Sequence, residues 1–114
     1  MPAKIRIVTK SVTMTATLND SKTAEALEKT LPVRSTAERW GDEVYFGVPV
    51  EMGLEDAQAK VPPGTVAYWP EGPSLCIFFG QTPYSPVNVI GALDGDAKKF
   101  AKVGAGETIT VEKA

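Results

Sequence analysis

Apolar and polar residues alternate along most of this chain with a period of two, which is typical of β-strands. In the first part, Lys4 to Lys10 and Val12 to Leu18 both alternate in this way, and many of their side chains are β-branched, which favours extended backbone. Lys10 and Ser11 form a short connection between the two stretches. The pattern therefore predicts an antiparallel hairpin at the start of the chain.

A helical pattern follows this hairpin. Ala24, Leu27 and Leu31 recur at positions i, i+3 and i+7, and Asn19-Asp20-Ser21 precedes them with side chains suited to capping a helix. Pro32 ends the pattern because proline cannot continue a helix. We expect a helix of about ten residues that covers one opening or face of a sheet.

The rest of the chain returns to short β-type stretches separated by glycine and proline. Strands are predicted over residues 33–40, 43–50, 65–69, 75–79, 87–90 and 107–112, with a short helical turn within 94–103. No βαβ rhythm and no internal repeat is present. About eight strands with one or two short helices predict a mainly β single domain, residues 1–114, folded as a closed antiparallel or mixed β-barrel.

Aromatic side chains gather in one part of the chain, since eight of the nine lie between residues 40 and 84. Neighbouring residues on a strand point to opposite faces, so adjacent large residues divide between the barrel interior and the other face. If Val44 and Phe46 face the interior, Glu43 and Tyr45 face away from it. By the same alternation Cys76 and Phe78 lie on the second face, which then combines aromatic rings with a carboxylate and a thiol.

Two arrangements of this second face remain open. In one, the helix and the irregular stretch 51–60 cover it as a small second core; in the other, it forms a ligand-binding groove. Aromatic rings would then supply apolar contact, while Arg39 and Glu43 would orient a polar group, unless Arg39 forms a salt bridge at the strand end instead. The candidate ligand-binding residues are Arg39, Trp40, Glu43, Tyr45, Tyr68, Trp69, Cys76 and Phe78.

Composition removes several kinds of chemistry. The chain of 114 residues has no histidine, which excludes Ser-His-Asp and Cys-His nucleophile pairs and histidine-ligated metals. Cys76 is the one cysteine, so it forms no internal disulfide, fits a reducing compartment, and is expected to be an inert buried thiol. No apolar stretch has the length of a signal peptide or a membrane span. We therefore expect a cytoplasmic protein without a membrane partner.

Charge argues against a nucleic-acid partner. Twelve basic and fourteen acidic residues give a net charge of −2, which leaves no basic surplus for phosphate binding. Residues 38–71 hold seven acidic and two basic residues, a balance of −5. Carboxylates can bind Ca²⁺ or Mg²⁺, but no spacing here matches a metal-binding loop. We expect solvated charges, no metal and no cofactor.

Several motifs together resemble those of a family of small prokaryotic cyclophilin-like proteins. The resemblance extends over nearly the whole chain, and it implies a cyclophilin-type β-barrel. The family is one of uncharacterised function, so the resemblance implies the fold and little chemistry. The motifs are Leu18-Asn19-Asp20-Ser21-Lys22-Thr23-Ala24, Arg39-Trp40-Gly41-Asp42-Glu43-Val44-Tyr45-Phe46, Ala67-Tyr68-Trp69-Pro70, Cys76-Ile77-Phe78-Phe79-Gly80-Gln81-Thr82-Pro83 and Val87-Asn88-Val89-Ile90-Gly91.

Three functional hypotheses follow. The first is a non-enzymatic barrel that binds a small molecule or an extended peptide in an aromatic groove, with no catalytic residue. The second is an enzyme, either a weak peptidyl-prolyl isomerase or a hydrolase that uses Glu43 as a base. True cyclophilins carry a Phe-His-Arg segment in their active face, and this chain has no histidine to match it. The third is a protein-interaction module, in which the aromatic residues form a homodimer face.

Overall fold

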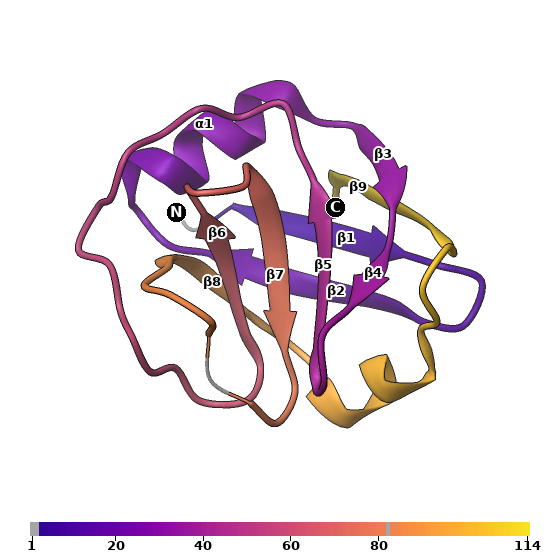
Figure 1. The fold of residues 1–114 in the computed structure, drawn as a ribbon. Helices are drawn as coiled ribbons and strands as arrows, with labels where there is room; N and C mark the ends of the chain where they lie inside the picture. Colours follow the sequence, from indigo (N-terminus) through magenta and orange to yellow (C-terminus); the bar gives the residue numbers. More distant parts are fainter. Residues whose placement is uncertain (1–2, 82) are drawn as a thin grey trace.

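The computed structural model describes residues 3–81 and 83–114 and confirms a mainly β fold (Figure 1). Nine strands and two short helices are present in the described residues, against about eight strands and one or two helices predicted. In chain order they are β1 (Lys4–Val8), β2 (Thr13–Leu18), α1 (Lys22–Thr30), β3 (Val33–Thr36), β4 (Glu38–Arg39), β5 (Glu43–Gly47), β6 (Thr65–Trp69), β7 (Ser74–Phe78), β8 (Asn88–Leu93), the 3-10 helix η1 (Ala97–Lys102) and β9 (Thr108–Lys113).

The strands form one sheet that nearly closes into a barrel. Its order is β3-β9-β1-β2-β8-β6-β7-β5-β4, with antiparallel pairing throughout. The two end strands, β3 and β4, follow each other in sequence with only Ala37 between them. The backbone of Ala37 is itself bonded, donating to Glu107 and accepting from Gly106. The chain thus crosses directly from one edge of the sheet to the other, which brings the two edges together.

Helix α1 forms where the sequence predicts it. The Ser21 hydroxyl accepts a hydrogen bond from the Ala24 backbone N–H at 3.1 Å, which caps the first turn. The helix ends at Thr30, and the Leu31–Pro32 peptide bond that follows is cis. Thr23, Ala24 and Leu27 are buried, and the helix lies across one end of the barrel (Figure 1).

The interior of the barrel is filled by one face of each strand. On β5, β6 and β7 this inner face carries alternate residues, and strand register sets them opposite one another: Phe46 and Tyr68 both pair with Leu75, and Val44 and Val66 both pair with Ile77. The alternation predicted for β5 and β7 is confirmed. The other face of the same strands carries Glu43, Tyr45, Ala67, Trp69, Cys76 and Phe78.

The second face is partly covered, by loop residues and not by the helix. Ala67, Cys76, Phe78 and Val87 form a small second cluster, separate from the barrel interior. Val61, from the long connection between β5 and β6, packs against it. The buried residues of α1 belong to the main core instead. The prediction that the helix covers this face is therefore wrong, whereas loop residues form a small second core over one portion of it and leave another portion open.

The connection between β5 and β6 is fastened to the start of α1. The Glu55 carboxylate accepts hydrogen bonds from the backbone N–H groups of Lys22 and Thr23 and from the Thr23 hydroxyl. These bonds, with the Thr23 hydroxyl first, lower the pKa of Glu55. The buried Asn88 amide accepts from the Glu55 backbone and donates to the Gly53 carbonyl. These contacts hold the connection against the barrel without a regular strand.

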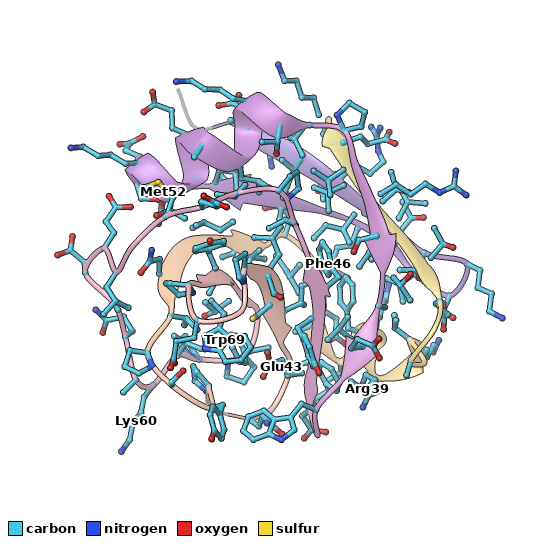
Figure 2. The ribbon with its side chains drawn as sticks, turned by 45° about the horizontal axis from the view of Figure 1, so that its top comes forward. Arg39, Glu43, Phe46, Met52, Lys60 and Trp69 are labelled. Carbon is cyan, nitrogen blue, oxygen red and sulfur yellow. The ribbon has the colours of Figure 1, made fainter. Side chains whose placement is uncertain are left out.

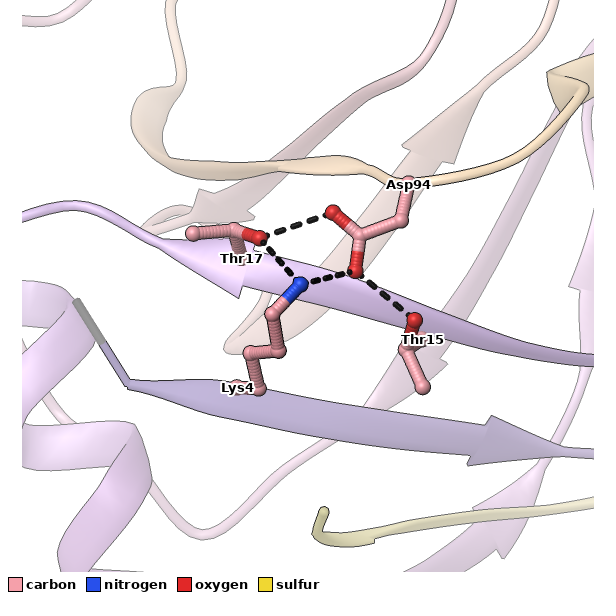
Figure 3. Close-up of polar contacts among 4 residues, drawn as sticks. All are labelled: Lys4, Thr15, Thr17 and Asp94. Atoms are coloured by element: carbon pink, nitrogen blue, oxygen red, sulfur yellow. Dashed lines mark hydrogen bonds and ion pairs between the residues drawn. The ribbon is translucent and has the colours of Figure 1, made fainter.

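A second polar cluster joins β1, β2 and the end of β8 (Figure 3). The Asp94 carboxylate accepts from the hydroxyls of Thr15 and Thr17, each at 2.7 Å, and from the Lys4 ammonium at 2.9 Å. These bonds, led by that from Lys4, lower the pKa of Asp94 to about 2. Asp94 therefore stays ionised and links three neighbouring strands at the surface.

Candidate aromatic pocket

A pocket of about 230 Å³ opens on the second face of β5 and β7. Its walls are mostly aromatic, and the carboxylate of Glu43 and the thiol of Cys76 lie among them. Figure 2 labels Glu43 and Trp69 on this face and Arg39 beside β4. The residues that line the pocket are Trp40, Glu43, Tyr45, Trp69, Cys76, Phe78, Pro83, Tyr84 and Val87.

Six of the eight candidate residues meet in this pocket. They come from β5, β6, β7 and the turn before β5, and strand register sets them side by side, with Glu43 opposite Phe78 and Tyr45 opposite Cys76. The six are Trp40, Glu43, Tyr45, Trp69, Cys76 and Phe78.

Tyr68 does not line the pocket. It pairs with Leu75, which faces the interior, and its side chain is 1% exposed within the main core. Its hydroxyl donates to the Val50 carbonyl and accepts from the Met52 backbone N–H. Adjacent residues on a strand cannot share a face, so Trp69 faces the pocket and Tyr68 faces inward.

Arg39 also lies outside the pocket and does not meet Glu43. Its guanidinium stacks over the Phe79 ring, 5.0 Å from the ring centre. Its N–H groups donate to three backbone carbonyls, those of Gly41, Ala101 and Val103. Because Arg39 pairs with Val44, one position along β5 from Glu43, the two side chains belong to opposite faces. The strand-end salt bridge is absent among the described residues, whose ion pairs are formed by other side chains.

Glu43 and Cys76 form the polar part of the pocket. Glu43 is 6% exposed, and burial raises the pKa of its carboxyl, although a hydrogen bond from the Cys76 thiol partly offsets this effect. Burial also raises the pKa of Cys76 well above its usual value, and the Glu43 charge and hydrogen bond raise it further. The thiol therefore stays protonated at neutral pH, and it donates a weak hydrogen bond to the carboxylate.

The mouth of the pocket is formed by rings at right angles. The Tyr84 ring lies 5.7 Å from the Trp40 ring and 6.4 Å from the Trp69 ring, at an interplanar angle of 83° in both pairs. Tyr84 is 77% exposed and Trp40 is 43% exposed. These two rings are therefore accessible from solvent, while Tyr45 and Phe78 form the deeper wall.

Trp69 is held in place by a chain of hydrogen bonds. Its indole N–H donates to the Ser85 hydroxyl at 2.6 Å, and that hydroxyl donates to the Glu71 carboxylate. Gly72 packs against the indole, since a Cβ at this position would lie 2.8 Å from a ring carbon. The orientation of Trp69 thus depends on the loop that carries Tyr84, because Ser85 belongs to the same loop.

The other end of this loop is attached to the turn before β5. The side-chain oxygen of Gln81 accepts from the Asp42 backbone N–H at 2.9 Å. Gly41 has a φ of +57°, and a Cβ there would lie 1.8 Å from the same oxygen. Glycine is therefore required at this turn both for its backbone conformation and for the space that Gln81 occupies.

Sequence reasoning missed Pro83, Tyr84 and Val87 as pocket residues. Pro83 and Tyr84 lie in a loop, where alternation says nothing about orientation. The available signal was an aromatic residue between two prolines, next to a strand that already carried candidate residues.

The acidic residues of 42–56 do not gather into a metal site. Among the described residues, no group of three or more histidine, cysteine or acidic side chains is arranged to hold a metal ion. Glu43 faces the pocket, whereas Glu55 binds the start of α1. Across residues 3–81 and 83–114, no helix has the length and apolar character needed to cross a membrane.

A model of the family described as Cyclophilin-like matches residues 3–112. The chain belongs to the cyclophilin-like family. This match confirms the resemblance seen in the sequence motifs, and it covers nearly the whole barrel.

Two solved structures share this cyclophilin-like barrel. The solution structure of the hypothetical protein AF2241 from Archaeoglobus fulgidus is 35% identical, with a TM-score of 0.84 over 99% of this chain and 95% of that one. The structure of McbB in complex with tryptophan is 18% identical, with a TM-score of 0.78 over 95% of this chain and 44% of that one. The second likeness shows the fold alone. A comparison with curated proteins gives no match.

Proposed function

We propose that this cyclophilin-like barrel binds a small organic molecule in the aromatic pocket, with Glu43 as the group that orients it. The observation that carries the proposal is a carboxylate almost completely buried beside a set of partly exposed rings. Burying a carboxylate is costly unless other groups compensate for the lost water. A ligand that brings a donor or a positive charge to Glu43 supplies that compensation.

The size of the pocket favours a small molecule over an extended peptide. Its volume of about 230 Å³ lies below the range of roughly 300 to 1,000 Å³ that is common for pockets of drug-sized ligands. A compact group of one or two rings, or a branched head group of similar size, matches this volume. An extended peptide would need a longer groove.

The chemistry of the pocket favours binding over catalysis. The Cys76 thiol remains protonated, and the chain has no histidine to activate it. A hydrolase that used Glu43 as its base would also need a group to stabilise the developing negative charge. The described pocket lining includes no cationic side chain for this role, and the indole of Trp69 already donates to Ser85.

Nuclear magnetic resonance provides a direct test. Trp40 and Trp69 are the two tryptophans of the chain, and both line the pocket, so the two indole N–H signals of ¹⁵N-labelled protein report on this site. The probes are 4-nitroaniline, a neutral ring with a donor, and tryptophan, which is bound in the solved McbB complex. We expect saturable shifts of both indole signals with at least one probe.

Two exposed side chains supply the matched variants. Tyr84→Ala removes a pocket ring that is 77% exposed, and Leu54→Ala removes an apolar side chain that is 68% exposed outside the pocket. Tyr84→Ala should weaken binding by about fivefold or more, in line with the loss of one ring contact, whereas Leu54→Ala should leave it unchanged. Absence of indole shifts at millimolar concentrations of both probes, or equal effects of the two variants, would overturn the proposal.

A further inference from the structure

The polar and aromatic groups of the pocket attract the same kind of ligand. A carboxylate attracts positive charge, and the faces of tryptophan and tyrosine rings do so as well through their negative electron clouds. Glu43 is buried in the wall of the pocket, and the Trp40, Tyr84 and Trp69 rings stand at its mouth. The Tyr84 ring is nearly perpendicular to each of the two tryptophan rings. A group that satisfies both features carries a positive charge.

Nothing described in the pocket neutralises Glu43 from within the chain. The nearest arginine in sequence, Arg39, faces the other side of the sheet and donates to backbone carbonyls. The described ion pairs involve other carboxylates. Residues 38–71, which supply four of the nine lining residues, also carry a net charge of −5. The local electrostatic potential therefore favours a cation over a neutral or negative ligand.

The scarcity of hydrogen-bond acceptors distinguishes between types of cation. A primary ammonium has three N–H donors and is strongly hydrated, so it needs several acceptors when it leaves water. The described lining offers the Glu43 carboxylate, the phenol oxygens of Tyr45 and Tyr84 and the weak sulfur acceptor of Cys76, and its other side chains accept no hydrogen bonds. An ammonium whose hydrogens are replaced by methyl groups needs no acceptors, and its methyl groups pack against rings.

We propose that the ligand of this pocket carries an alkylated ammonium group, held between the Glu43 carboxylate and the rings of Trp40, Tyr84 and Trp69. The inference rests on the proposed function, because it specifies the class of molecule that the pocket binds.

The test compares compounds of nearly equal shape. Choline carries a trimethylammonium group, 3,3-dimethylbutan-1-ol replaces its nitrogen with carbon, and ethanolamine is the corresponding primary amine. Titrations followed by the indole signals of Trp40 and Trp69 give a dissociation constant for each compound. We expect choline to bind about tenfold or more tightly than either of the others, as charge and ring contacts together imply.

Two pairs of variants assign this preference to residues. Glu43→Gln should remove most of the advantage of choline over 3,3-dimethylbutan-1-ol, whereas Glu28→Gln, which removes the same charge from helix α1, should preserve it. Trp40→Leu keeps apolar area but removes a ring face, so it should weaken choline more than the neutral alcohol. Trp40 is 43% exposed, so this variant folds even if a change at Glu43 disturbs the sheet.

The outcomes separate this inference from the proposed function. If 4-nitroaniline or the neutral alcohol binds as tightly as choline, or if Glu43→Gln and Glu28→Gln behave alike, the alkylated-ammonium inference is wrong while ligand binding stands. If no compound shifts the indole signals, both proposals fail. A choline preference that disappears in Glu43→Gln and persists in Glu28→Gln supports both.

Discussion

The two faces of β5, β6 and β7 are built from alternate residues of the same strands, and they treat polar groups differently. On the inner face, Tyr68 is buried with its hydroxyl bonded to backbone on both sides, at Val50 and Met52. On the outer face, Glu43 is also buried, but the group beside it is a thiol, and the surrounding rings are partly open to solvent.

This difference separates a polar group that the chain itself satisfies from one that we propose a ligand satisfies. The inner polar group is satisfied by the chain itself, so it stabilises the fold without inviting another molecule. The outer carboxylate is costly to keep buried, and a suitable ligand would reduce that cost. Substitutions on the two faces should therefore have opposite consequences for folding and for binding.

The largest effect is expected on the inner face. Phe46→Ala removes a ring that is 1% exposed in the main core and should reduce the free energy of unfolding by about 3–5 kcal/mol. Tyr84→Ala removes an aromatic ring of the outer face and should change it by less than about 0.5 kcal/mol. Urea denaturation of the two variants measures both. Similar losses in the two would show that the faces contribute alike to stability.

An intermediate effect is expected from a single hydroxyl on the inner face. Tyr68→Phe leaves the Val50 carbonyl and the Met52 N–H without their partner and should cost about 1–3 kcal/mol of unfolding free energy. Probe binding to the pocket should remain unchanged, because Tyr68 does not line it. Tyr84→Phe, on the exposed ring, is the matched control. Loss of probe binding in Tyr68→Phe with retained stability would contradict the division between faces.

The smallest effect on the free energy of unfolding is expected at Glu43, where a substitution should raise this free energy instead of lowering it. Because burial raises its folded pKa, the folded protein holds the proton more tightly than the unfolded chain, so stability from this group is lost as pH rises through the folded pKa. Glu43→Gln has no such loss. The variant should therefore gain stability relative to the natural chain as the pH rises above 4.5, the ordinary pKa of a glutamate, in urea denaturation at several pH values.

The groups that share the pocket with Glu43 are the Cys76 thiol and the phenols of Tyr45 and Tyr84. The raised pKa of the thiol keeps it protonated at neutral pH. The pKa shift of Asp94 has the opposite sign. Because its folded pKa is lowered to about 2, the stability that the Asp94 carboxylate contributes is lost only as the solution becomes strongly acidic. A stability difference between Glu43→Gln and the natural chain that stays constant with pH would rule out a titrating Glu43.

Most of the fold was predictable because local patterns and long-range pairing agree. Period-two alternation located the strands, and the cap and apolar spacing located α1. The two-residue β4 and the closure through Ala37 were not visible in the sequence, because a break in a strand at one residue leaves the alternation of residues 33–40 almost intact.

The candidate site was predictable only where the alternation of residues along a strand decides which face a side chain occupies. Alternation within each strand assigns four candidates to the same face, namely Glu43, Tyr45, Cys76 and Phe78. Alternation also requires Tyr68 and Trp69 to occupy opposite faces of β6, but it does not say which of the two side chains points inward. That choice depends on the pairing of Tyr68 with Leu75, a contact between different strands.

Arg39 and Tyr84 illustrate a second limit of the sequence. The position of Arg39 is decided by backbone carbonyls near η1, far away in the chain, and by the Phe79 ring. The position of Tyr84 is decided by a loop anchored through Gln81 and Ser85. Such contacts follow from tertiary structure and leave no periodic signal in the sequence.

The closure of the barrel has a consequence for motion. The sheet is joined to itself at a seam, and the strand on one side of that seam, β4, contributes only two residue pairs to its ladder with β5. Local opening of a protein starts where the fewest bonds must break. Trp40 comes directly after β4, and its backbone N–H donates to Glu43. The wall of the pocket is therefore attached to the strand with the shortest ladder in the sheet, so local opening of the seam at β4 is expected to displace Trp40 as well.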